Sequence, residues 1–244
     1  MSIKALTLPT LSNAKGVFHG CFNRYGGVSQ GPWESLNIST SCGDEGKMVA
    51  QNRELIARHL GLEMPPLTLQ QVHGSEVIVV DQQSPAGQEG DAMLTRTPGL
   101  GLLIQQADCQ AVLLFDPDCP AVANIHVGWR GNVVEIISRT VRAMTQHFAS
   151  RPERLLAGIS PSLGPCCAQF VNYKTEFPVS FQEFQARPHY FDLWQISRQQ
   201  LLDAGLIAEH ISLAQVCTCC NDDFFSYRRE KITGRCGSII GLTP

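Results

Sequence analysis

The sequence predicts an α/β (α+β) fold, in which residues 1–244 form one layered domain with mixed β-sheets flanked by helices. Three observations predict it. Apolar residues recur at helical spacing in several segments, other segments are short apolar or alternating runs typical of strands, and the two kinds mix along the chain. No internal repeat, charge block or low-complexity linker separates them. The order of the segments does not predict how the strands are arranged in their sheets.

Helices are expected over residues 44–62, 131–148 and 192–205, with a weaker candidate at 171–186. Gly61 and Gly205 favour the ends of the first and third, because glycine readily adopts the left-handed conformation that closes a helix. Asp192 is a suitable N-cap for the third helix. Pro178 interrupts the weaker candidate. The segment 131–148 is expected to be continuous, because its apolar residues keep helical spacing throughout.

Strands are expected in seven runs: 16–22, 67–80, 100–106, 111–116, 121–127, 155–161 and 236–242. Between two of these runs, DPDCP at 116–120 is typical of a turn, because proline and aspartate both favour one. We therefore expect 111–117 and 121–128 to form an antiparallel hairpin.

The composition limits the classes of partner. Charged residues make up 17% of the chain and the formal net charge is −3, which gives no reason to expect nucleic acid or an anionic membrane as a partner. The sequence has no signal-peptide pattern and no membrane-spanning run. It has ten cysteines but nothing that directs export, so we expect reduced thiols and a cytoplasmic protein.

The expected hairpin brings a cysteine and a histidine together. If Phe115 pairs with Ala121, Cys109 lies opposite or nearly opposite His126, with Cβ atoms about 5 Å apart. A shift of one residue would put the two side chains on different faces, so the inference depends on the register. Such a pair can be inert core packing, a nucleophile and its base, or two ligands of a soft divalent metal.

The residues after His126 favour a functional site. GWRGN leads into a helix, whose N-terminus attracts anions, and Arg130 offers a planar cation that suits phosphate or carboxylate. A metal needs a third ligand, for which His73 is the first candidate and His19 the rival. The remaining histidines are expected to lie on helix faces or loops, in contact with solvent.

Polar motifs elsewhere supply further candidates. Arg24 and Asn37 lie in what is expected to be a loop, and Arg228 follows a pair of phenylalanines. The alternative for the run around Arg228 is a solvated edge strand. Asp91 and Asp108 could lie near the site or could cap turns.

The cluster CTCCND at 217–222 could hold a second metal ion. It supplies three thiols but no evident fourth ligand apart from Cys236, whereas structural zinc sites typically have paired CxxC spacing. We therefore expect free, buried thiols here.

Several motifs together resemble one known family. In order along the chain they are NRYGGVS, SLN, CGD, NR at 52–53, QQVHG, DA at 91–92, ADC, HVGWRG, GPCC and FFSYRR. They resemble the bacterial YfiH-type family, whose members are called laccase-domain or polyphenol oxidase proteins, zinc-dependent purine nucleoside phosphorylases and, in one branch, peptidoglycan editing factors. The resemblance runs nearly end to end.

The resemblance implies a zinc site, with copper as the alternative metal, formed by His73, Cys109 and His126, which would also be the catalytic residues. It implies a monomer that cleaves adenosine, inosine and methylthioadenosine with phosphate and that deaminates adenosine. Arg130, Arg228 and Arg24 would bind phosphate, with Asn37 in the substrate site. Asp108 is a candidate proton donor to the purine.

Other functions stay open at this point. The same metal or Cys109 could serve an amidase that edits a peptidoglycan precursor, or the chain could be a metal-binding scaffold without activity. A laccase needs several histidine-rich copper sites, which the seven histidines cannot supply, so phenol oxidation is expected to be a side activity at most.

Overall fold

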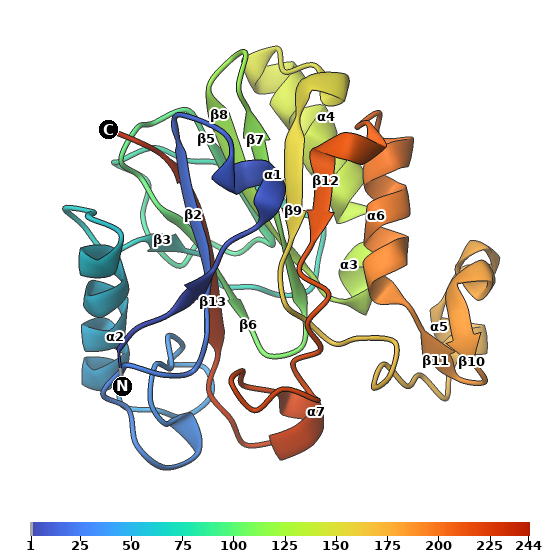
Figure 1. The fold of residues 1–244 in the computed structure, drawn as a ribbon, viewed down its shortest axis with the longest axis horizontal. Helices are drawn as coiled ribbons and strands as arrows, with labels where there is room; N and C mark the ends of the chain where they lie inside the picture. The colour runs from blue at the N-terminus through green and yellow to red at the C-terminus, as the bar shows by residue number, and fades with distance from the viewer. Residues whose placement is uncertain (1) are drawn as a thin grey trace.

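The computed structural model describes residues 2–244 and consists of four layers (Figure 1). A long helix, α2, covers one face of a five-stranded sheet, and helices α4 and α6 cover the outer face of a six-stranded sheet. The two sheets pack against each other in the middle. This arrangement confirms the predicted α/β class with mixed sheets flanked by helices.

The strands are β1 (Ala5–Leu6), β2 (Val17–Phe22), β3 (Leu67–Thr68), β4 (Val77–Val79), β5 (Ala92–Thr95), β6 (Leu102–Gln106), β7 (Gln110–Asp116), β8 (Ala121–Val127), β9 (Leu156–Ile159), β10 (Gln185–Arg187), β11 (Tyr190–Phe191), β12 (Ile211–Leu213) and β13 (Cys236–Leu242). The α-helices are α1 (Pro9–Ser12), α2 (Gly46–His59), α3 (Trp129–Val133), α4 (Ile136–Phe148), α5 (Tyr173–Glu176), α6 (Leu193–Asp203) and α7 (Tyr227–Glu230). Short 3₁₀ helices are η1 (Gly31–Trp33), η2 (Pro152–Arg154), η3 (Val179–Phe184) and η4 (Ala208–His210).

Both large sheets are mixed. The five-stranded sheet has the order β1-β2-β13-β6-β3, and its pairs are antiparallel except β6 with β3. The six-stranded sheet has the order β12-β9-β7-β8-β5-β4, with parallel pairs at its two edges. Strands β10 and β11 form a separate small ribbon.

Successive side chains of the central strands point to opposite faces of the six-stranded sheet and so belong to two different parts of the core. In β7, Ala111, Leu113 and Phe115 face the five-stranded sheet, whereas Val112 and Leu114 face helices α4 and α6. These two faces explain why the central strands have few polar residues, since both sides of the sheet are covered. Side chains that point inward near a strand end therefore reach the space between the two sheets.

Two expected helices are confirmed together with their ends. In α2, Val49 and Ile56 are buried as the spacing predicts, and Gly61 has φ +69° just after the last turn. In α6, the Asp192 side chain accepts a hydrogen bond from the Gln195 backbone N–H, at 3.1 Å. Helix α6 ends before Gly205, which has φ +102°.

The expectation of one continuous helix over 131–148 is wrong, because α3 and α4 are separated at Glu135, where φ is +58°. The buried amides explain the break. Gln200 donates to the Asn132 carbonyl at 2.7 Å, and the Asn132 side chain donates to Ser197 at 2.9 Å, so α6 holds the end of α3. The apolar spacing alone could not predict this contact.

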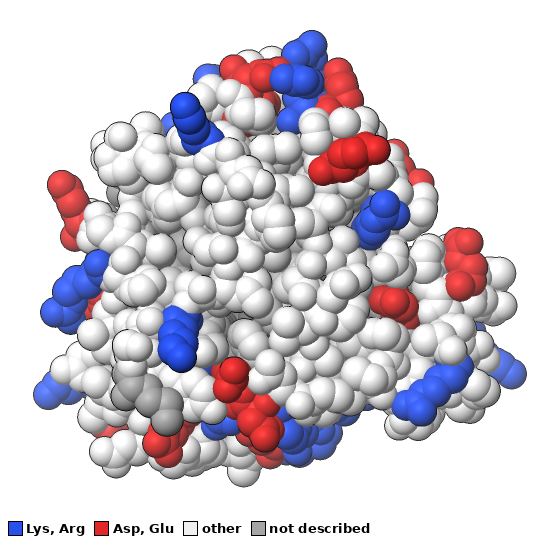
Figure 2. Space-filling model, in the orientation of Figure 1, with Lys and Arg blue, Asp and Glu red and all other residues white. Residues whose placement is uncertain are grey.

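The surface carries no large patch of one charge on the face shown in Figure 2. Lysine and arginine side chains lie singly among aspartate and glutamate, mostly around the edge. This view agrees with the small net charge of −3. Among the helices of residues 2–244, none combines the length and the apolar character that a membrane crossing needs.

Candidate metal centre

Three segments bring the predicted trio together at one end of the space between the sheets. His126 lies in β8, Cys109 directly precedes β7, and His73 lies in the loop between β3 and β4. One ligand atom from each residue lies within 4.8 Å of the other two. The rival candidate His19 lies elsewhere, where its buried Nε2 accepts a hydrogen bond from the Leu8 backbone N–H at 2.8 Å.

The register of the β7–β8 hairpin determines where the Cys109 sulfur lies relative to the His126 imidazole. The expected pairing of Phe115 with Ala121 is wrong by one residue: Phe115 pairs with Val122, and Ala111 pairs with His126. Cys109 lies two residues before Ala111, so its side chain is on the same face as His126. The two residues are therefore diagonal neighbours and not directly opposite each other.

His73 completes the trio from a strained backbone. Its φ is +61°, which is unusual for a residue with a side chain. The Cys109 Sγ lies 3.8 Å from His73 Nε2, and the rings of His73 and His126 are 4.7 Å apart at 77°. The sulfur and both imidazoles therefore share one small space.

Asp91 holds both histidines in place. Its buried carboxylate lies 2.7 Å from His126 Nδ1 and accepts hydrogen bonds from the backbone N–H groups of Val72, His73 and Gly74. The contact with His126 favours a proton on Nδ1 and leaves Nε2 for a metal. The sequence left Asp91 open between a place near the site and turn capping, and in the structure it contacts His126 and also accepts from the backbone of the His73 loop.

The negative charge of the Cys109 thiolate and the positive charge of the His126 imidazolium stabilise each other. Burial acts to raise the pKa of the Cys109 thiol, but the charge of His126 and hydrogen bonds from both imidazoles outweigh it and lower that pKa. For His126, burial acts to lower the pKa, whereas the Cys109 thiolate and Asp91 raise it. The thiolate, which is the form that binds metals, is thus favoured here.

The donor set fits zinc. One thiolate and two imidazoles are ligands that zinc commonly takes, and three protein ligands leave a position for a substrate atom. Gly128 supports the fit, because a Cβ at this position would lie 2.9 Å from His73 Cδ2 and 3.1 Å from Cys109 Sγ. Only glycine leaves the two ligands room to approach each other.

A cavity of about 890 Å³ opens beside the trio. Two arginines line it: Arg53 from α2 and Arg235 from the residue before β13. Tyr227, at the start of α7, lines it as well and is 52% exposed. Sequence reasoning missed both arginines as site residues. The available signal was the position of Arg53 beside Asn52, a polar residue in the apolar stripe of α2.

The arginines predicted to bind phosphate lie outside the residues that line this cavity. Arg24 forms an ion pair with Glu230 at 2.8 Å. Arg130 is exposed and stacks on Trp129, with its guanidinium carbon 4.2 Å from the ring centroid. Arg228 donates from its guanidinium to the Cys167 carbonyl at 2.6 Å.

Asn37 lies behind the cavity wall and binds the backbone of Arg235. It is fully buried, and its Oδ1 accepts a hydrogen bond from the Arg235 backbone N–H at 2.8 Å. Its Nδ2 donates to Asp44 at 2.8 Å. Asn37 therefore fixes the backbone from which Arg235 reaches the cavity.

Asp108 is engaged by other parts of the chain. Its Oδ1 accepts hydrogen bonds from the hydroxyls of Thr218 and Ser226, each at 2.7 Å. Its Oδ2 accepts from the Arg228 backbone N–H at 2.6 Å. With three such donors, the Asp108 carboxylate connects three separate parts of the chain.

Comparison with known proteins agrees with the family resemblance that the sequence motifs indicate. Residues 18–243 match the family described as multi-copper polyphenol oxidoreductase laccase. The purine nucleoside phosphorylase YfiH of Escherichia coli strain K12 is 34% identical over 97% of this chain and 98% of its own length. A purine nucleoside phosphorylase of Deinococcus radiodurans is 36% identical over 92% of this chain and 88% of its own. The crystal structure of the Bacillus licheniformis hypothetical protein YfiH superimposes with a TM-score of 0.87 at 27% identity, covering 93% of each chain.

Proposed function

The chain belongs to the multi-copper polyphenol oxidoreductase laccase family, and from that premise we propose that it is a zinc-dependent purine nucleoside phosphorylase and not a copper oxidase. One observation carries the proposal. A thiolate and two imidazoles meet at the wall of a cavity that two arginines also line. The names of the relatives from Escherichia coli and Deinococcus radiodurans point to the same reaction.

The positions of the histidines argue against laccase chemistry. Multicopper oxidation needs several copper sites, most of them rich in histidine. Among residues 2–244, His73 and His126 belong to a potential metal-binding cluster, and no other histidine does. Copper could replace zinc in the trio, but the donor set suits a single ion.

His73, Cys109 and His126 would hold the zinc ion. A bound zinc ion would act as a Lewis acid at its open position, polarising a substrate atom. Asp91 keeps His126 in the required tautomer and fixes the loop of His73. Gly128 leaves the space that the ligands need.

Arg53 and Arg235 would bind the phosphate. A guanidinium can donate two parallel hydrogen bonds to phosphate oxygens, and two of them offset most of the phosphate charge. In this proposal they take the direct contacts predicted for Arg24, Arg130 and Arg228, which act from outside the cavity. Tyr227, at the rim, would stack on the purine.

In the reaction, a phosphate oxygen forms a bond to the anomeric carbon of the ribose while the bond from that carbon to the purine nitrogen breaks. The departing purine nitrogen takes up the proton that the attacking dihydrogen phosphate loses. The arginines hold the phosphate at the anomeric carbon, so that positioning and charge stabilisation supply most of the rate. Inosine, adenosine and methylthioadenosine are the expected substrates, with deamination of adenosine as a second activity of the same site.

The predicted monomer stays part of this proposal, and size-exclusion chromatography with light scattering tests it. Its ten free cysteines suit the cytoplasm.

The test is to incubate the purified protein with inosine, with and without phosphate, and to identify the products. Ribose 1-phosphate and hypoxanthine should form only with phosphate and should be lost in His73→Ala. Arg235→Gln should raise the KM for phosphate, whereas Arg130→Gln, outside the cavity, should leave it unchanged. Absence of hypoxanthine in every condition would refute the proposal. Phosphate-independent release of an amino acid from a peptidoglycan precursor would instead support the editing amidase.

A further inference from the structure

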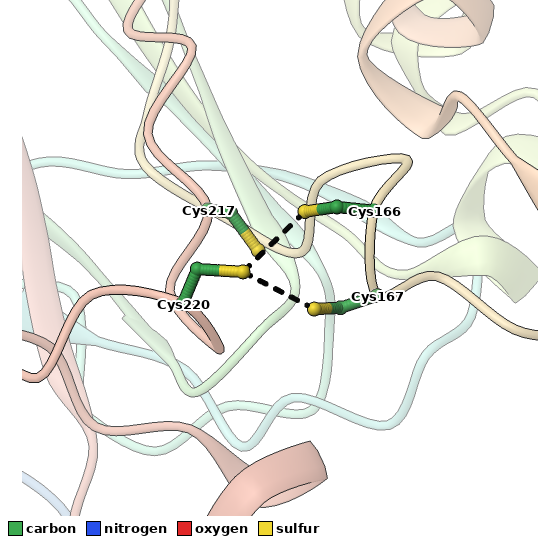
Figure 3. A group of neighbouring side chains, drawn as sticks. All are labelled: Cys166, Cys167, Cys217 and Cys220. Carbon is green, nitrogen blue, oxygen red and sulfur yellow. Dashed lines mark hydrogen bonds between the residues drawn. The ribbon is translucent and has the colours of Figure 1, made fainter.

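A second group of side chains that could hold a metal ion lies outside the candidate centre. The side chains of Cys166, Cys167, Cys217 and Cys220 point toward one another from two loops (Figure 3). The Cys220 sulfur lies 3.5 Å from the sulfur of Cys166 and 3.4 Å from that of Cys167. All four sulfurs lie within 4.8 Å of one another, and all four thiols are free.

These distances match a metal site. At a zinc–sulfur distance of about 2.3 Å, the four corners of a tetrahedron are about 3.8 Å apart. A disulfide would require about 2.05 Å between two of the sulfurs. Hydrophobic packing does not explain the cluster either, because Cys166 and Cys220 are exposed and gain little from burial.

The backbone of the second loop is shaped for chelation. Cys217 and Cys220 form a C-x-x-C pair, and the N–H groups of Cys220 and Asn221 both donate to the Cys217 carbonyl, at 3.2 and 3.0 Å. The Gly164 backbone N–H donates to the Cys217 sulfur at 3.3 Å. Hydrogen bonds of this kind orient thiolate ligands in metal sites.

The first loop supplies the other half of the site. Cys167 N–H donates to the Gly164 carbonyl at 2.9 Å, which closes a turn that presents the sulfurs of Cys166 and Cys167. The sequence pattern includes Cys219 as a ligand, offers no evident fourth apart from Cys236, and favours buried thiols. The expected burial is wrong, because Cys220 is exposed and Cys217 and Cys219 are half-buried. The structure leaves Cys219 out and adds two sulfurs from this loop, about fifty residues earlier in the chain.

Positive charge surrounds both loops. Arg187 donates to the Cys166 carbonyl at 2.9 Å, Arg228 to the Cys167 carbonyl at 2.6 Å, and Arg229 to the Thr218 carbonyl at 2.7 Å. A divalent ion with four thiolates carries a net charge of −2, which Arg187 and Arg228 can offset, whereas Arg229 is also paired with Glu230 at 3.0 Å. The same four thiolates without a cation would repel one another.

We propose that Cys166, Cys167, Cys217 and Cys220 bind one soft divalent cation, of the zinc class, in a closed structural site. Four thiols release four protons as the four metal–sulfur bonds form, and no oxidant or reductant takes part. The ion leaves no open position, so it stabilises the structure and does not bind substrate. This inference does not rest on the proposed function.

The site would also position the candidate metal centre. Thr218, between two of the ligands, donates its hydroxyl to Asp108 at 2.7 Å, and the Arg228 backbone donates to the same carboxylate. Leu163, three residues before Cys166, donates its N–H to the Asp108 carbonyl at 2.8 Å. Asp108 directly precedes Cys109, so a clamp on the two cysteine loops fixes the start of β7.

The experiment separates the two sites by using the Cys109→Ala variant as the background. Purified under reducing conditions, this variant should retain one ion per chain. Adding Cys217→Ser should remove that ion, whereas Cys219→Ser, on the same loop but outside the cluster, should leave it in place. With Co²⁺ as the probe, the Cys109→Ala protein should show the intense thiolate-to-metal absorption of a four-sulfur tetrahedral site.

The wild-type protein gives a second measurement that does not depend on the folding of a variant. Cysteine alkylation without reduction, followed by mass spectrometry, should show that Cys166, Cys167, Cys217 and Cys220 are protected until a chelator is added. A disulfide between the two loops, or rapid alkylation with no effect of chelator, would overturn the proposal. So would a Cys109→Ala protein that binds no ion while remaining folded.

Discussion

Replacing Asp91 with asparagine should separate metal affinity from general stability. Each carboxylate oxygen of Asp91 accepts two hydrogen bonds: Oδ1 from the His73 backbone and His126 Nδ1, and Oδ2 from the backbones of Val72 and Gly74. In Asp91→Asn, one of the two oxygens becomes an NH₂ group. With the NH₂ group in place of Oδ2, the backbone N–H groups of Val72 and Gly74 lose their acceptor; in place of Oδ1, the His73 N–H loses its acceptor and His126 loses the one that keeps a proton on Nδ1.

The magnitude follows from these contacts. A hydrogen bond to a charged group contributes about 1.5–3 kcal/mol, so two lost bonds should lower the free energy of unfolding by about 3 kcal/mol or more. The second consequence is local. Removing the partner that orients a metal-binding histidine typically lowers metal affinity by about 10–100-fold, and we expect zinc affinity to fall by that amount.

The assay is zinc affinity by competition with a coloured chelator, alongside urea unfolding of the same samples. Asp116→Asn is the matched control, because Asp116 is a buried carboxylate at the other end of β7, where it accepts from the backbones of Asp118 and Cys119. This control should keep the zinc affinity of the wild type. If Asp91→Asn also bound zinc as tightly as the wild type, the assignment of Asp91 as the residue that orients His126 would be wrong.

Three further outcomes are expected. Gly128→Ala should lower zinc affinity by at least about tenfold with little loss of helix content, because the new methyl group contacts both His73 and Cys109; unchanged affinity in the chelator assay would count against the described geometry. Burial lowers the pKa of His19 to about 4 from 6.5, so the unfolded chain takes up the proton first and stability should be lost as pH falls from about 6.5 to about 4. His19→Gln should flatten that part of the profile of unfolding free energy against pH, and an unaltered slope would contradict it. Glu135→Gly should raise the free energy of unfolding by about 0.5–1 kcal/mol, since glycine adopts φ +58° without strain; thermal denaturation checks this, and a lower Tm would argue against the strain.

The fold could be predicted where local pattern and tertiary contacts agree. The hairpin of β7 and β8 carries its signal in two apolar runs and a turn between them, and Asp192 and Gly205 mark the ends of α6 through their own backbone preferences. The break at Glu135 could not be predicted, because it depends on Gln200 reaching the Asn132 carbonyl from another helix. Strand β5 was missed since its four buried residues give too short a run to recognise.

Only the part of the candidate site that comes from neighbouring segments of the sequence could be predicted. Cys109 and His126 lie close in sequence, just before one strand and near the end of the next, and the turn between these strands makes their pairing evident. Arg53 and Arg235 lie far apart in the sequence and line the same cavity only in the folded chain. Charge alone does not show which arginines reach a cavity, and Arg24 and Arg228 instead hold loops together.

The distance between the two sheets affects which core substitutions the site can accept. Asn124, two residues before His126 on the same strand face, donates from its amide to the carbonyls of Leu102 and Ser238 in the opposite sheet, each at 2.8 Å. This amide acts as a spacer that sets how far His126 stands from the facing layer. A core substitution that widens or narrows the gap should therefore move the imidazole, so that packing far from the cavity acts on the geometry of the His126 ligand.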